Sequence, residues 1–240
     1  MIAGRRAARA AFVLLLAIAA GSARAQEPAA FRPLGARPDG EPVLRVYVVR
    51  HAQAWKNVPA SQRPPGLDAA GLDALTGAGQ ARARAVGLRL RGAGASRVVC
   101  SPAQRARQTA QAIASVLGTG AIEPSDAFQP LQHGASRRAA DYRWRTENWR
   151  AGLDPRPEGG ESLADGLARA SGFLGAAAQE TPGATLVVVT HGEIAAALLS
   201  EAAGVSPLAG YDRNFVGEGT ISDVAVYEGR WELLAKGVEP

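Results

Sequence analysis

Two of the chain's three histidines directly follow apolar runs that are rich in β-branched residues. Arg50 and His51 follow the run 43–49 (VLRVYVV), and His191 follows the run 185–190 (TLVVVT). Such runs are typical of strands buried on both faces, and open α/β sheets bind ligands at the carboxyl ends of their strands. Arginine and imidazole side chains there could bind an anion and carry nucleophilic or acid–base chemistry. Taken alone, the Arg50–His51 pair could equally be a solvated strand end.

A third apolar run, 97–100 (RVVC), ends at Ser101. The residues after it have helical composition, and we predict a helix with Ser101 as its N-cap and Pro102 at its first position. Arg105 would then lie at the start of the second turn, near a helix N-terminus that suits a phosphate group. If the three strands are neighbours, two arginines and two histidines converge at one sheet edge. That convergence favours a functional site over a solvated strand end.

The remaining segments alternate between helix and strand signals. A helix is predicted from the N-cap Thr76 to about Arg91, with Gln80 completing a capping box and with Ala81, Ala85, Leu88 and Leu90 facing the core. Further predictions are an irregular loop at 54–72, a short strand within 121–128, partial helix in 129–151, a helix from the N-cap Ser162 to about 179, a helix at about 194–203, and a hairpin of 222–227 with 231–235. Strands alternating with helices indicate an α/β layered domain.

Five short blocks stand in a characteristic order along the chain. They are Arg50-His51-Ala52 with Asn57, Leu75-Thr76 with Gly79-Gln80-Ala81, Ser101-Pro102 through Arg105-Ala106 to Thr109-Ala110, Gly160-Glu161-Ser162, and Thr190-His191-Gly192. Together they resemble the histidine phosphatase superfamily, the phosphoglycerate mutase-like group. Each block alone is a weak signal, whereas five in the family's order are a strong one. The resemblance implies a three-layer α/β/α sandwich with a mostly parallel central sheet.

The same resemblance implies a phosphatase site that needs no cofactor and no metal ion. His51 would attack phosphorus and form a phosphohistidine that water then hydrolyses, because a neutral imidazole can both attack and leave. Arg50 and Arg105 would neutralise the phosphoryl oxygens. His191, if protonated, would be a third cation there, and Asn57 would contact the substrate. None of the histidines has metal-ligand spacing with another.

The chain departs from the family pattern at two places. Ala52 replaces the signature glycine, and its small Cβ is tolerated if the local φ is negative. Where family members that use a general acid place a glutamate, this chain has Gln132 and His133. His133, Glu161 and Glu193 are the alternatives for the proton donor. Each also has a structural explanation, as a solvated loop histidine or as a favourable negative charge at a helix start.

Residues 1–25 have the three-part pattern of a secretory signal peptide: arginines at 5, 6 and 9, an apolar stretch at 10–21, and small residues before Gln26. The apolar stretch is too short to span a bilayer stably, so an uncleaved anchor is the less favoured alternative. Residues 26–42, rich in Pro, Gly and Ala, are predicted to be a linker. The resemblance then implies that residues 43–240 form a single histidine phosphatase domain.

The net charge of +5 comes mostly from this leader, which holds four arginines and no acid, whereas residues 26–240 hold 23 basic and 22 acidic residues. A nearly neutral remainder gives little support to nucleic-acid binding. The single cysteine, Cys100, cannot form an internal disulfide, and at a strand end it is best explained as a buried apolar side chain. Export without disulfides fits a bacterial periplasm.

These observations favour an exported, periplasmic or secreted phosphatase acting on a small-molecule or cell-envelope phosphate ester, with no stable membrane span after leader cleavage. A mutase is less favoured because its substrates are cytosolic metabolites. The alternative is a catalytically weak phosphate- or sugar-phosphate-binding domain of the same fold, which phosphoenzyme formation would separate from a phosphatase. The arginine- and aromatic-rich stretch 137–150 is predicted to line or cap the pocket, or to form a solvated helix face. The sequence indicates neither the substrate nor the oligomeric state.

Overall fold

The computed structural model describes residues 40–138 and 140–240, so the predicted signal peptide and most of the predicted linker lie outside the described residues. Its centre is a six-stranded sheet in the order β3-β2-β4-β1-β5-β6. The strands are β1 (Leu44–Arg50), β2 (Arg97–Cys100), β3 (Glu123–Pro124), β4 (Ala184–Thr190), β5 (Ile221–Tyr227) and β6 (Arg230–Val238). The first four are parallel to one another, while β5 and β6 run antiparallel at one side. The predicted mostly parallel sheet is therefore confirmed.

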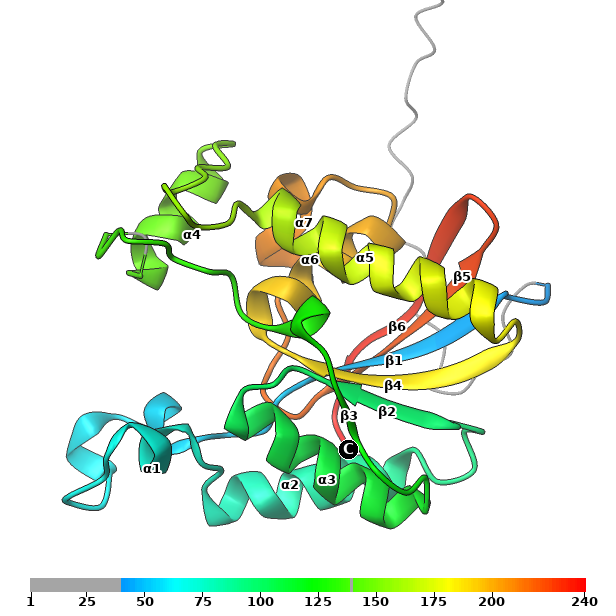
Figure 1. The fold of residues 1–240 in the computed structure, drawn as a ribbon, viewed down its shortest axis with the longest axis horizontal. Helices are drawn as coiled ribbons and strands as arrows, with labels where there is room; N and C mark the ends of the chain where they lie inside the picture. The colour runs from blue at the N-terminus through cyan, green and yellow to red at the C-terminus, as the bar shows by residue number, and fades with distance from the viewer. Residues whose placement is uncertain (1–39, 139) are drawn as a thin grey trace, which may run out of the picture. The chain divides into compact units, whose positions relative to one another are not determined.

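Helices cover both faces of the sheet (Figure 1). On one face lie α2 (Gly77–Arg89) and α3 (Gln104–Leu117), and on the other lie α5 (Leu163–Glu180), α6 (Gly192–Ala202) and α7 (Pro207–Asn214). Successive residues of a strand point to opposite faces. Accordingly Val46 and Val48 of β1 belong to the core cluster under α5 and α6, while Tyr47 and Val49 belong to the cluster under α2 and α3. The expected three-layer sandwich is confirmed.

Helix α2 begins as predicted but buries a different face. Thr76 caps it by accepting a hydrogen bond from the backbone N–H of Gly79 at 2.9 Å. The predicted capping box is wrong because the third helical position is Gly79, not Gln80. Of the four predicted core positions only Leu90 is buried, whereas Ala81 and Leu88 are exposed and Ala85 is half-buried. The buried residues of the helix are Gly79, Ala83, Val86 and Gly87.

A glycine at the helix–helix contact explains why apolar periodicity predicted the wrong buried face for α2. A Cβ on Gly87 would lie 2.8 Å from the side chain of Val116 in α3, so α2 and α3 approach each other through a position that carries no side chain. Apolar periodicity does not register such a contact, because it counts side chains.

Helix α3 starts later than predicted. Its N-cap is Ala103, so Ser101 is not the N-cap and Pro102 is not the first helical residue. Arg105 is consequently the second residue of the helix and lies in its first turn. The hydroxyl of Ser101 accepts a hydrogen bond from the N–H of Ala103 at 3.2 Å and is also used in the site described below. Cys100 is fully buried, as expected.

The remaining segments agree with the predictions in outline. The loop predicted at 54–72 contains the 3-10 turns η1 (Trp55–Asn57) and η2 (Ala60–Gln62) and leads into α1 (Ala69–Asp73), and the predicted strand within 121–128 is β3 with the 3-10 turn η3 (Asp126–Phe128). The partial helix within 129–151 is α4 (Tyr142–Arg150). Ser162 and Asp165 form a full capping box at the start of α5.

Helix α7 was not predicted, although Ser206 followed by Pro207 is a usable start signal. The predicted carboxyl-terminal hairpin is present as β5 and β6, with longer strands than expected. Among the described residues no single helix is long and apolar enough to cross a membrane, and α6 with α7, bent by 113°, meets the length and composition criteria only as a pair.

Candidate active site

The strand register brings the predicted site residues to one sheet edge. Arg50 pairs with Thr190, and Cys100 pairs with Val189. The ladder continues one residue further, because the N–H of His51 donates to the carbonyl oxygen of Thr190 at 2.9 Å. The three strands β2, β4 and β1 are thus adjacent, as the convergence argument required.

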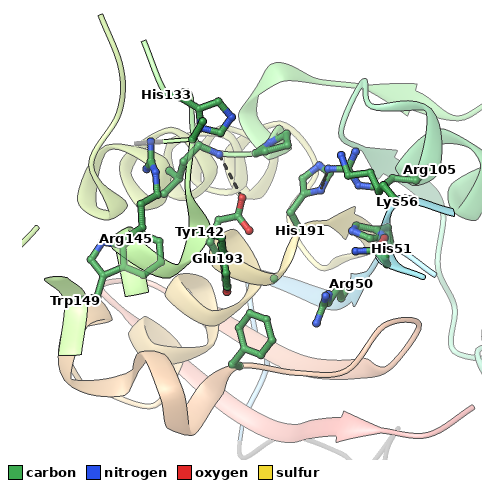
Figure 2. A pocket seen from close by; sticks show the side chains of 16 residues that line it. Arg50, His51, Lys56, Arg105, His133, Tyr142, Arg145, Trp149, His191 and Glu193 are labelled. Carbon is green, nitrogen blue, oxygen red and sulfur yellow. Dashed lines mark hydrogen bonds between the residues drawn. The ribbon is translucent and has the colours of Figure 1, made fainter. Parts of the chain in front are cut away.

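A pocket of about 450 Å³ opens at this edge (Figure 2). Of the predicted site residues, seven line it: Arg50, His51, Asn57, Arg105, His133, His191 and Glu193. Glu161 does not line it. The rest of the wall comes partly from the stretch 137–150 and from Gly192, which the sequence analysis named, and partly from residues that it did not: Lys56, Pro130, Leu131 and Phe215.

His51 is buried and neutral. Its Nδ1 lies 2.9 Å from the carbonyl oxygen of Ala52, which can only accept, so Nδ1 carries the proton and Nε2 keeps its lone pair. Burial lowers the pKa of His51 to about 3, and the positive charge of Arg105 adds to this effect. The imidazole is therefore in the form that a nucleophile requires.

Ala52 fits where the family pattern has glycine. No non-glycine residue in the described chain has a positive φ, so Ala52 has the negative φ that a Cβ tolerates. Its N–H donates to the hydroxyl of Thr109 at 3.0 Å, and that hydroxyl donates to the carbonyl oxygen of Arg105 at 2.7 Å. Thr109 thereby ties the loop after β1 to α3.

His191 is also neutral, with both ring nitrogens hydrogen-bonded. Arg105 donates through Nη2 to Nδ1 of His191 at 2.8 Å, so the proton is on Nε2, which donates to the hydroxyl of Ser101 at 2.7 Å. Burial holds the pKa of His191 well below its usual range, and Arg105 lowers it further. In this arrangement His191 is not a cation. Its ring centroid lies 5.2 Å from that of His51.

The two arginines are held through their Nη nitrogens. Arg50 donates through Nη1 to the carbonyl oxygen of Val216 at 2.8 Å. Its Nη2 lies 3.5 Å from a carboxylate oxygen of Glu218, and its Cζ lies 4.9 Å from the ring centroid of Phe215. Arg105 forms an ion pair with Asp73. The Nε–H groups of both guanidiniums are buried and have no hydrogen-bond partner among the described residues. Buried donors without partners are costly, and both guanidinium groups line the same pocket, where they suit an anion.

Lys56 and Asp73 belong to the site although the sequence analysis missed them. Lys56 lines the pocket, and its Nζ lies 3.3 Å from Oδ1 of Asp73. Burial alone would raise the pKa of Asp73, but Arg105 and Lys56 together lower it, so this carboxyl group is ionised. Both residues lie within or beside the aperiodic loop after β1, where no spacing rule connects them to Arg105.

The three proton-donor alternatives have different surroundings. Glu161 forms an ion pair with Arg169 at 2.8 Å and accepts from the N–H of Gln132 at 2.9 Å. Burial would raise the pKa of Glu161, but these contacts lower it, which opposes a role as an acid. His133 is exposed. Glu193 is half-buried in the first turn of α6, accepting weakly from the N–H of Leu131 at 3.4 Å.

Helix α4 supplies the far wall of the pocket, in agreement with one of the two predictions for 137–150. Tyr142, Arg145 and Trp149 line the pocket from this helix. Arg145 donates to the carbonyl oxygens of Gln132 at 2.8 Å and Glu161 at 3.1 Å. In the view of Figure 2, Glu193 lies between these α4 residues and the cluster of His51, Arg105 and His191.

The start of α6 adds a further anion-binding element. The helix begins at Gly192 beside the pocket, and the N–H groups of a helix's first turn favour negative charge. A Cβ at Gly192 would lie 2.6 Å from the ring of Phe215 and 3.5 Å from Nε of Arg50, so the close approach requires glycine. Within the described part of the chain, no group of three or more His, Cys, Asp or Glu side chains could hold a metal ion.

Comparison with known proteins gives one family. The model of the histidine phosphatase superfamily (branch 1) matches residues 46–238. The probable phosphoglycerate mutase GpmB of Salmonella paratyphi C (strain RKS4594) is 29% identical over 202 residues, which are 81% of this chain and 90% of that protein. The 2,3-bisphosphoglycerate-dependent phosphoglycerate mutase of Brucella anthropi is 32% identical over 178 residues, which are 68% and 82% of the two chains.

Solved structures show the same fold. A mycobacterial glucosyl-3-phosphoglycerate phosphatase in complex with VO3 superimposes with a TM-score of 0.64 at 22% identity, covering 81% of this chain and 99% of that one. A phosphoserine phosphatase from Entamoeba histolytica in complex with phosphoserine superimposes with a TM-score of 0.63 at 18% identity, covering 81% and 96%.

Proposed function

Because this chain belongs to the histidine phosphatase superfamily, we propose that it hydrolyses phosphate monoesters through a phosphohistidine on His51. One observation carries the proposal: a neutral imidazole with a free Nε2 lone pair lines the same pocket as two guanidinium groups, those of Arg50 and Arg105. That combination suits a dianionic phosphoryl group next to a nucleophile. A domain that only binds phosphate would need the cations but not the nucleophile.

The chemistry proceeds in two displacements. Nε2 of His51 attacks phosphorus, a P–N bond forms, and the ester P–O bond breaks so that the alcohol departs with a proton. Water then attacks phosphorus and gives a proton back to the donor that protonated the alcohol, the P–N bond breaks, and inorganic phosphate leaves a neutral imidazole behind. Arg50 and Arg105 stabilise the charge on the transferring oxygens, and each such donor contributes about 3 kcal/mol to lowering the barrier.

His191 takes part as a donor whose charge follows the ligand. Arg105 and burial keep it neutral. A phosphate dianion beside the two groups offsets the charge of Arg105 and so favours proton uptake at His191. The proton goes to Nδ1, the hydrogen bond from Arg105 breaks, and the Nδ1–H of the imidazolium then donates to the phosphoryl group as the third cation. Asn57, exposed in η1 at the pocket, contacts the rest of the substrate.

Glu193 is the proton donor to the leaving alcohol in this proposal. It lines the pocket two residues after His191, whereas Glu161 is bound to Arg169 outside the pocket. His133 is a pocket residue too, but its exposed position leaves it less confined relative to the reacting bond. A phosphatase is favoured over the phosphoglycerate mutase activity named for the two curated relatives, because the proposed leader would export the chain away from cytosolic metabolites.

The test is turnover of p-nitrophenyl phosphate by matched variants of two arginines in α3. Arg105→Gln removes a phosphoryl donor and should lower kcat/KM by about 10²- to 10³-fold. Arg107→Gln removes an exposed arginine two residues further along the same helix and should leave kcat/KM within about twofold. Equal activity of the two variants would contradict the proposed phosphate pocket.

Export is part of the proposal and rests on residues 1–25. Expression of the full chain in a bacterial host, followed by fractionation and amino-terminal sequencing, should give a periplasmic or secreted protein that begins at Gln26. A cytoplasmic protein that keeps residues 1–25 would contradict the proposed export. The argument against a mutase would then no longer hold.

A further inference from the structure

We propose that the pocket takes phosphate esters of uncharged, ring-bearing alcohols, with the ring resting on Tyr142 and Phe215. The inference rests on the proposed phosphatase function and adds its substrate class. It follows from the half of the pocket away from His51.

Two exposed aromatic rings line the pocket, Tyr142 in that half and Phe215 next to Arg50. Tyr142 is 46% and Phe215 is 37% exposed, and both line the pocket. Their ring centroids are 6.4 Å apart with a tilt of 49°. Large aromatic side chains that stay exposed together in a concave site indicate a binding wall.

The two rings are fixed from behind. Tyr142 shares a hydrogen bond with the hydroxyl of Tyr211. The buried ring of Trp149 packs 4.6 Å from Tyr211, which lies 5.8 Å from Phe215. The ion pair of Arg150 with Asp212, at 2.7 Å, joins α4, which carries Tyr142, to α7, which carries Tyr211. A wall that is already ordered loses little freedom when a flat ring stacks on it.

The polar groups in this half do not favour a second anion on the substrate. The carboxyl group of Glu193 lines the pocket here. In the proposed mechanism it holds a proton when the ester binds, so an anion beside it gains no ion pair. The guanidinium of Arg145 is already engaged by two backbone carbonyl oxygens. Pro130 and Leu131 add apolar surface, so an uncharged ring would meet apolar faces.

Binding of unreactive phosphonates tests the inference separately from catalysis. By titration calorimetry, benzylphosphonate should bind about 10-fold more tightly than methylphosphonate and than 3-phosphonopropionate, which carries a carboxylate. Tyr142→Ala should remove most of that preference while leaving methylphosphonate binding unchanged. Leu153→Ala, which truncates an exposed apolar side chain outside the pocket, should change none of the three affinities.

Three results would overturn the inference: tightest binding of 3-phosphonopropionate, an equal loss of all three ligands in Tyr142→Ala, or no binding of any phosphonate. Ring-selective binding without turnover would instead count against the phosphatase proposal alone. Turnover of benzyl phosphate and of glucose 6-phosphate then shows whether the preferred ring is aromatic or a sugar. The inference is supported if kcat/KM for either ester is higher than kcat/KM for 3-phosphoglycerate. It is contradicted if kcat/KM is lower for both esters.

Discussion

His51 owes its nucleophilic form to its neighbours. The carbonyl oxygen of Ala52 fixes the proton on Nδ1, and burial with Arg105 lowers the pKa of the ring to about 3. Free imidazole would be partly protonated near neutral pH. Because His51 stays neutral far below its ordinary pKa, its own protonation does not limit the rate near neutral pH.

Glu193→Gln should identify the proton donor. Glutamine keeps the size of the side chain but cannot give up a proton usefully, so kcat for glycerol phosphate should fall about 100-fold. The p-nitrophenolate leaving group departs without protonation, so kcat for p-nitrophenyl phosphate should change little. Steady-state kinetics with the two esters measure this difference.

His133→Asn is the matched control, because His133 lines the same pocket. It should leave both esters nearly unaffected. If His133→Asn produced the ester-selective loss and Glu193→Gln did not, the donor would be the histidine. An equal loss on both esters in Glu193→Gln would indicate a binding role instead.

At the scale of the elements, the position of His51 depends on how closely α2 approaches the loop after β1. A Cβ on Gly79 would lie 2.1 Å from the carbonyl oxygen of Gln53, two residues beyond His51. The same carbonyl accepts the N–H of Thr76 at 3.0 Å, so the start of α2 is fixed on that loop. The contact is backbone against backbone and has no flexible end that could move aside.

Gly79→Ala should therefore destabilise the fold by about 3 kcal/mol and lower kcat as the loop after His51 shifts. Gly77→Ala, two residues earlier in the same helix, places its Cβ in open space and should be neutral or stabilise by up to about 1 kcal/mol. Urea unfolding gives both values. Equal stability of the two variants would show that the loop relaxes around the added methyl group.

The elements also show what the sequence could predict. Apolar runs ending in Arg50-His51 and Thr190-His191 gave the central strands, since burial on both faces leaves a strong signal. The start of α3 was predicted wrongly because the hydroxyl of Ser101 bonds to His191, 90 residues away, and a local capping rule does not see that partner. Asp73 and Lys56 were missed for a related reason: only the folded loop brings them to Arg105.

At the scale of the whole molecule, the two buried histidines of the site lower the free energy of unfolding in acid. The pKa of His51 and that of His191 are both lowered in the folded state, whereas the unfolded chain protonates its histidines near pH 6.5. Below that pH the unfolded state binds protons that the folded state does not. Stability is therefore lost as the pH falls from about 6.5 towards 3, by up to about 1.4 kcal/mol per pH unit for each histidine.

His51→Asn should reduce this acid sensitivity. Between pH 6.5 and 4.5 the wild type should lose about 2 kcal/mol more of its free energy of unfolding than His51→Asn does, as measured by urea unfolding at the two pH values. His133→Asn, which removes an exposed histidine, should keep the wild-type slope. Carboxylates titrate alike in all three proteins, so a difference in slope reports His51. Identical slopes would contradict the neutral, buried state of this ring.

Detection of a phosphorylated His51 tests the central claim most directly. The wild-type protein, mixed with p-nitrophenyl phosphate and quenched in alkali, should carry phosphate on the peptide that contains His51, located by mass spectrometry and lost on acid treatment. His51→Ala should show neither the phosphate nor turnover. Phosphate on a different residue, or turnover that persists in His51→Ala, would contradict the phosphohistidine mechanism.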